Sequence, residues 1–264
     1  MKRSVLLSVA MAIIVSALSA SRLLADLPAM DIHQIELERK IARAAFGAKD
    51  ADALMMLLNK GSFYVRPEVA LYLGRLGTSK AKPKLLELNA QYAEFPCMEQ
   101  GEYGVAILLI KNKKRKAQKK SLLDAATCDP RKKKWPFSVI DKAGEELLRY
   151  GGIDIEKRLA GILTYGAQYT VLALQCRRLA APEAIQKCIQ TLEVHETPQK
   201  AEAAEKVLIS HYWPTAETAV RELEGRMMKW MKENPADKGV RLTVFSRCGK
   251  LLQQQSQATG KKGG

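Results

Sequence analysis

Three histidines and five cysteines are the residues of this sequence best suited to metal binding or nucleophilic chemistry. His33 and Glu36 are three positions apart, which would place an imidazole and a carboxylate on one helix face as a pair of metal ligands. The sequence has no second pair of this kind, so we predict an exposed polar face there and no metal site. Cys248 has no nearby histidine with which to form a nucleophile pair. We therefore predict no catalytic residue and no cofactor.

The sequence motifs of several large enzyme classes are also missing. There is no Gly-x-Ser-x-Gly elbow, no phosphate-binding glycine loop followed by Lys-Ser or Lys-Thr, and no dinucleotide fingerprint. There is no Cys-x-x-Cys, so a zinc ribbon or a thioredoxin-type redox motif is not expected. A non-enzymatic protein is our first interpretation, and an enzyme built on a helical scaffold is the least favoured one.

Four of the cysteines have spacings that suggest disulfide bridges. Cys176 and Cys188 are symmetric about Pro182, where a turn between two helices is predicted, and Cys97 and Cys128 are symmetric about another predicted turn. Each pair would then lie at matching heights on antiparallel helices, and a bridge there would add about 3 kcal/mol by constraining the unfolded chain. The alternative is that the cysteines are small buried core residues.

A strongly basic segment between residues 111 and 134 is the clearest functional signal. It holds eleven lysines and arginines against Asp124 and Asp129, a net charge of +9. Such a segment can bind an anionic partner, or it can be a solvated loop that keeps the protein soluble. The predicted binding residues are Lys111, Lys113, Lys114, Arg115, Lys116, Lys119, Lys120, Arg131, Lys132, Lys133 and Lys134.

Residues 1–25 have the layout of a secretory signal peptide. Lys2 and Arg3 precede a nearly uncharged run of small and aliphatic residues, and small residues suited to cleavage follow it. An uncleaved membrane anchor is the alternative, although the run is at the short limit for crossing a bilayer. We expect export to the periplasm or the extracellular space, with no membrane span after cleavage. Export disfavours nucleic acid as the anionic partner and favours a lipid, an acidic glycan or a protein.

The elements that must position any site are helices. Asp31 and Asp50 are predicted to cap helices, and the predicted helix stops are Gly47, Gly74, Gly77, Gly151 and Gly166. Glu145 and Glu146 are predicted to lie on a solvated helix face. In the segment Arg66–Leu88, apolar residues recur at helical spacing, Gly77 ends a first helix, and a second helix opens after Pro83. Two such short helices cannot bury their apolar faces alone, so they need similar neighbours. Corresponding apolar positions recur along the chain at intervals of roughly 30 to 40 residues, which is typical of helical repeat families.

The segment Arg66–Leu88 resembles a HEAT repeat, a helical hairpin that stacks into a solenoid, and Ala201–Leu223 resembles it less closely. The Asp and Arg that usually recur between HEAT units are not evident. The resemblance implies an all-α fold, a right-handed α-solenoid of about six stacked hairpins plus a C-terminal helix. We expect a signal peptide at 1–25, a repeat domain at 26–252 and a disordered polar tail at 253–264.

The same resemblance implies a scaffold or adaptor that binds a protein partner, whose identity the sequence does not give. The alternative function is attachment to an anionic envelope lipid or acidic glycan through the basic segment.

Overall fold

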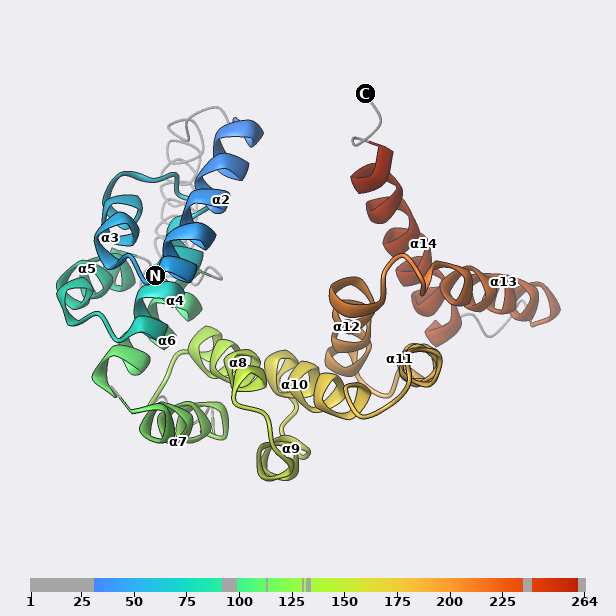
Figure 1. Ribbon diagram of the computed structural model, residues 1–264. Coiled ribbons are helices and arrows are strands. Elements are labelled where there is room, and N and C mark those ends of the chain that lie inside the picture. Colours follow the sequence, from blue (N-terminus) through green and yellow to red (C-terminus); the bar gives the residue numbers. More distant parts are fainter. Residues whose placement is uncertain are drawn as a thin grey trace, which may run out of the picture. The chain divides into compact units, whose positions relative to one another are not determined.

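The computed structural model describes residues 31–91, 99–112, 114–129, 131, 134–234 and 239–260, with side chains up to residue 254. The described residues are helices joined by short turns, without strands, so the predicted all-α class is confirmed (Figure 1). Within them, no helix combines the length and the apolar character needed to cross a bilayer. The signal peptide, Cys97, Lys113, Lys132, Lys133 and the end of the polar tail are predictions that lie outside the described residues.

The α-helices follow one another closely along the chain. They are α2 (Ile32–Ala48), α3 (Ala51–Lys60), α4 (Arg66–Leu76), α5 (Lys82–Gln91), α6 (Glu99–Lys111), α7 (Arg115–Ala126), α8 (Phe137–Glu146), α9 (Ile153–Leu159), α10 (Tyr165–Cys176), α11 (Ala181–Val194), α12 (Pro198–Val207), α13 (Glu217–Glu233) and α14 (Gly239–Gly260). Short helical turns η1 (Ser79–Ala81), η3 (Leu147–Arg149) and η4 (Leu208–Tyr212) precede α5 and extend α8 and α12. Helix α14 includes residues that we expected to belong to the polar tail.

The chain divides into two compact units, and the first of them ends at Arg66. In this unit the side chains of Asp31 and Asp50 cap α2 and α3, as predicted, by accepting hydrogen bonds from the backbone N–H groups of the first turn. Helix α2 continues through Gly47, the predicted stop, and ends where Lys49 adopts a left-handed conformation with φ of 59°. Both helices bury an apolar stripe against each other.

The second unit, residues 67–264, contains a row of helices in which each packs against the next but one along the chain. Helix α6 contacts α8, α8 contacts α10, and α10 contacts α12 (Figure 1). The intervening helices also pack on this row, since α7 contacts α8, α9 contacts α10, and α11 contacts both α10 and α12. Helices α13 and α14 form a hairpin, from which α13 contacts α11. One apolar core runs through much of this unit.

Glycines allow the backbones in this row to approach closely. A Cβ on Gly74 would lie 2.8 Å from the Cα of Ala106, and one on Gly166 would overlap the carbonyl oxygen of Asp141. We expected Gly74 and Gly166 to end helices, and both predictions are wrong, because these glycines lie inside α4 and α10. A glycine that stops a helix and one that admits a neighbouring backbone are alike in sequence, and only the packing separates them.

Helix α9 is accordingly shorter than predicted, and ends at Leu159 rather than near Gly166. Thr164 starts α10 by accepting a hydrogen bond from the Ala167 N–H at 3.4 Å. Two other predicted stops are confirmed: Gly77 and Gly151 have φ of +69° and +64°, values that glycine adopts without the steric penalty of a side chain.

Candidate functional site

A hollow of about 680 Å³ lies along the row of helices formed by α6, α8, α10 and α12. We call it the acidic groove. Gly144 and Gly166 allow α8 and α10 to approach closely, and longer side chains of both helices line the hollow. It is lined by Gln100, Glu102, Pro136, Phe137, Ser138, Asp141, Lys142, Glu145, Tyr165, Glu202 and Lys206.

Lys142 is the centre of an ion-pair network in the acidic groove. Its Nζ lies 3.0 Å from a carboxylate oxygen of Glu102 and 2.5 Å from one of Glu145. Burial by itself lowers the pKa of a lysine, but the two carboxylates outweigh this effect and raise the pKa of Lys142 above its ordinary value. Lys142 is therefore a permanent cation, and Glu102 and Glu145 are its counter-charges.

Asp141 and Tyr165 line the same groove. Burial raises the pKa of Asp141, and the charges of Glu145 and Glu202 raise it further, although a 2.7 Å hydrogen bond donated by the Gly166 N–H opposes the shift. The pKa of Tyr165 is raised by burial and by the same two glutamates. Burial is the largest cause of both shifts, and the neighbouring carboxylates add to it.

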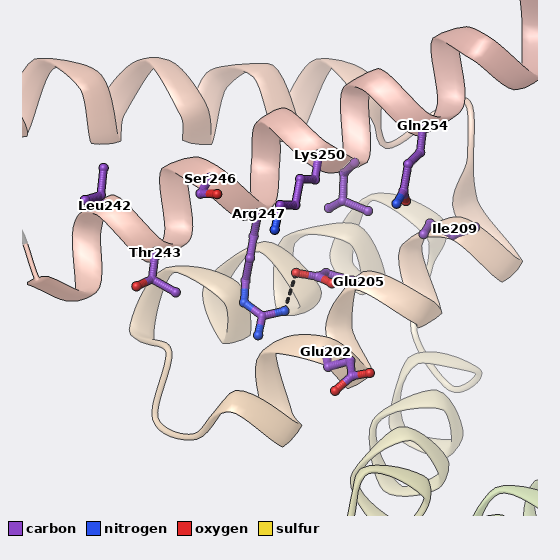
Figure 2. Close-up of a pocket in the computed structure, with 10 residues that line it drawn as sticks. Glu202, Glu205, Ile209, Leu242, Thr243, Ser246, Arg247, Lys250 and Gln254 are labelled. Carbon is purple, nitrogen blue, oxygen red and sulfur yellow. Dashed lines mark hydrogen bonds and ion pairs between the residues drawn. The ribbon is translucent and has the colours of Figure 1, made fainter. Parts of the chain in front are cut away.

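A second hollow, of about 610 Å³, lies between α14 and the segment formed by α12 and η4 (Figure 2). Arg247 extends from α14 toward α12 and makes a 2.7 Å ion pair with Glu205. Thr243, Ser246 and Lys250 lie along the same helix. Glu202 on α12 lines both hollows, so the second hollow is a neighbour of the acidic groove.

The predicted basic segment is divided by the structure into paired and exposed cations. Lys119 makes a 2.6 Å ion pair with Asp154, and Arg131 makes one of 2.9 Å with Asp129. Arg115 donates a hydrogen bond to the Arg149 carbonyl and lies 5.0 Å above the Tyr150 ring. The exposed lysines that form no ion pair with a described carboxylate are Lys111, Lys114, Lys116, Lys120 and Lys134. Trp135 packs against the core and does not contribute an exposed ring.

No disulfide is present among the described cysteines, and the predicted Cys97–Cys128 bridge includes a residue outside them. Cys176 and Cys188 do face each other across the α10–α11 hairpin, but their sulfur atoms are 3.7 Å apart and both are buried free thiols. This distance is a contact between two thiols, whereas a disulfide bond is about 2.05 Å long. Cys128 is also a free thiol, so it takes part in no bridge in this structure. Cys248 is buried in the core, which raises the pKa of its thiol to about 12.

The histidines show no sign of a metal site. Among the described residues, no group of three or more histidine, cysteine or acidic side chains is arranged to hold a metal ion. His33 is exposed on α2. His211 lies 3.4 Å from the Tyr169 hydroxyl, and burial together with the Arg177 charge lowers its pKa.

We did not predict the residues that form the acidic groove. We assigned Glu145 and Glu146 to a solvated helix face, and for Glu146 this is wrong: its side chain is 3% exposed and accepts hydrogen bonds from Arg75. A signal was present, because Val139, Ala143 and Glu146 follow the spacing of one helix face, and a carboxylate on an apolar stripe indicates a buried ion pair. Nothing in the sequence places Glu202 beside Asp141.

Comparisons of the chain with protein-family models, with curated proteins and with solved structures gave no match.

Proposed function

We propose that this protein is an exported, non-enzymatic scaffold that binds another protein along the row formed by α6, α8, α10 and α12. The observation that carries the proposal is the acidic groove, an open hollow of about 680 Å³ on successive helices of this row. In this proposal the helices form a right-handed α-solenoid of about six hairpins, in which successive units build a broad binding surface, and the contact of each helix with the next but one supports it. We propose export because residues 1–25 have the layout of a secretory signal peptide.

Site-directed photo-crosslinking in the native cell tests this proposal. A photoreactive phenylalanine analogue is placed at Phe137, which lines the groove and is 59% exposed. The matched control carries the analogue at Ile153, at the start of α9, which is 58% exposed and lies outside the groove. We expect a discrete crosslinked protein at position 137 and not at 153. The purified partner should then bind the chain, and Phe137→Ala should weaken that binding. Identical crosslinks at both positions would refute the proposal.

A second candidate function, attachment to an anionic envelope lipid or acidic glycan, is favoured by helix α7. Its N-terminal turn carries Arg115 and Lys116 and no acidic residue. The N-terminus of a helix is the positive end of its dipole, so cations there destabilise the helix and an external anion would stabilise it. Lys116 and Lys120 are one turn apart and exposed, and could contact one anionic surface together.

Sedimentation with phosphatidylcholine vesicles, with and without phosphatidylglycerol, tests this second function, and retention on immobilised heparin tests the glycan alternative. Each lysine near an anionic membrane contributes about 1 kcal/mol, so changing Lys116 and Lys120 to alanine should weaken vesicle binding about 30-fold. The control changes Lys229 and Lys232 on α13, which are also exposed. If the two double variants bind equally well, attachment does not occur through α7.

A further inference from the structure

The acidic groove has a charge opposite to that of the chain as a whole. The chain carries a formal net charge of +15, whereas the groove is lined by four carboxyl groups and two lysines. One of these lysines, Lys142, is already bound by Glu102 and Glu145. Asp141 and Glu202 form no ion pair with a described cation. Burial is the largest cause of the raised pKa of Tyr165, and the charges of Glu202 and Asp141 raise it further. The groove therefore has unneutralised negative charge.

Aromatic side chains lie beside this charge. Phe137 begins α8 and is 59% exposed within the groove, although the energetically preferred place for a phenylalanine is the core. Tyr165 is half-buried and stacks on Tyr169 with 6.2 Å between ring centroids. Aromatic faces next to carboxylates are a suitable environment for a lysine or arginine, because the rings attract the cation and cover its aliphatic stem.

The hydrogen bond that Asp141 accepts does not require a negative charge. Its carboxyl accepts the hydrogen bond from the Gly166 N–H, and the amide oxygen of an asparagine could accept the same bond. Burial and the neighbouring glutamates disfavour the charged form of Asp141, as its raised pKa records. A carboxyl group whose charged form is disfavoured by burial and by neighbouring charges is typical of a functional site.

From this charge and geometry we infer that the acidic groove receives a lysine or arginine side chain from an extended basic segment of a partner protein. Asp141 and Glu202 would bind the cationic head, and Phe137 and Tyr165 would pack on its stem. This inference rests on the proposed protein-binding function and narrows the partner to one with a basic segment. A second copy of this chain, which has its own basic segment, is the competing occupant.

Selection of random displayed peptides on the purified chain tests the inference. Peptides are selected on the wild-type protein and then counter-selected on the Asp141→Asn variant. The counter-selection removes peptides that bind outside the groove, such as acidic peptides bound to the lysines of α7. We expect the survivors to be rich in lysine or arginine next to apolar residues. A surviving set without this enrichment, or no surviving peptides, would overturn the inference.

Fluorescence anisotropy with a selected peptide then measures the contribution of each residue. We expect Asp141→Asn and Phe137→Ala each to weaken binding about tenfold, and replacement of the peptide's arginine by citrulline, which keeps the shape and removes the charge, to do the same. Glu222→Gln, which neutralises an exposed carboxylate on α13, is the control and should leave binding unchanged.

The melting temperature of Asp141→Asn should be equal to or above that of the wild type, which separates a binding defect from unfolding. Equal affinity for the arginine and citrulline peptides would overturn the inference. Self-association of the chain that Asp141→Asn abolishes would overturn it in favour of the second copy. If crosslinking at Phe137 captures a partner without a basic segment, the proposed function stands and this inference fails.

Discussion

The buried ion pair between Arg75 and Glu146 supports the helix row, and its removal is the perturbation with the best-defined outcome. Arg75 on α4 donates two hydrogen bonds to the Glu146 carboxylate, at 2.9 and 2.6 Å, and lies 5.5 Å above the ring of Tyr72. Arg149 donates a third hydrogen bond to this carboxylate, at 3.2 Å. The side chain of Glu146 is 3% exposed, so water cannot replace a lost partner.

We predict that Arg75→Ala lowers the free energy of unfolding by about 3 kcal/mol. Breaking a buried pair by removing one partner costs about 3–5 kcal/mol, because an uncompensated charge remains. The lower end applies here because Arg149 still donates to Glu146. For a domain of this size, the loss corresponds to a fall of about 6 to 12 °C in melting temperature. Urea unfolding followed by circular dichroism measures it.

Two comparisons separate this explanation from a general effect of removing an arginine. Arg221→Ala removes an exposed pair with Glu217, whose side chains are 60% and 42% exposed, and should cost less than about 0.5 kcal/mol. Combining Arg75→Ala with Glu146→Leu removes the stranded charge and should recover most of the loss. The reasoning is refuted if Arg75→Ala costs no more than Arg221→Ala, or if the double variant is as unstable as the sum of its single changes.

Three further predictions concern packing, thiols and pH. Gly166→Ala should lower the free energy of unfolding by about 2 kcal/mol or more, roughly the cost of overpacking, because the added Cβ would overlap the Asp141 carbonyl. Gly225→Ala on α13 should raise it by about 0.5–1 kcal/mol, because the space around Gly225 is open. Chemical denaturation measures both changes. Cys176 and Cys188 should react with a thiol reagent only after unfolding, and then without added reductant; blocked thiols in the denatured, unreduced protein would instead indicate a bridge. The pKa of Asp141 is raised in the folded state, so the contribution of Asp141 to stability is fully present below its unfolded pKa and is lost as pH rises through its folded pKa. The stability of Asp141→Asn relative to wild type should therefore increase between acid and neutral pH. A difference that does not change with pH would contradict this prediction.

Local sequence signals determined much of the secondary structure. Asp31 and Asp50 cap the helices that they were predicted to cap, and Gly77 and Gly151 end helices where predicted. Such features depend on a few neighbouring residues, because a capping hydrogen bond or a positive φ involves only the adjacent turn of the chain. The all-α class follows from the same kind of information, since apolar spacing within one segment is sufficient to indicate a helix.

Contacts between segments were decided only by the tertiary structure. Gly166 looks in sequence like a glycine that ends a helix. Only the close approach of α8 to α10 shows that it is a packing residue. Glu146 reads as a surface residue until Arg75, distant in sequence, is placed beside it. The acidic groove has the same origin, because it draws residues from four helices whose neighbours depend on how the whole unit packs. The sequence by itself determined the helices and the basic segment, since both depend on nearby residues, whereas the buried ion pair and the acidic groove depend on long-range packing.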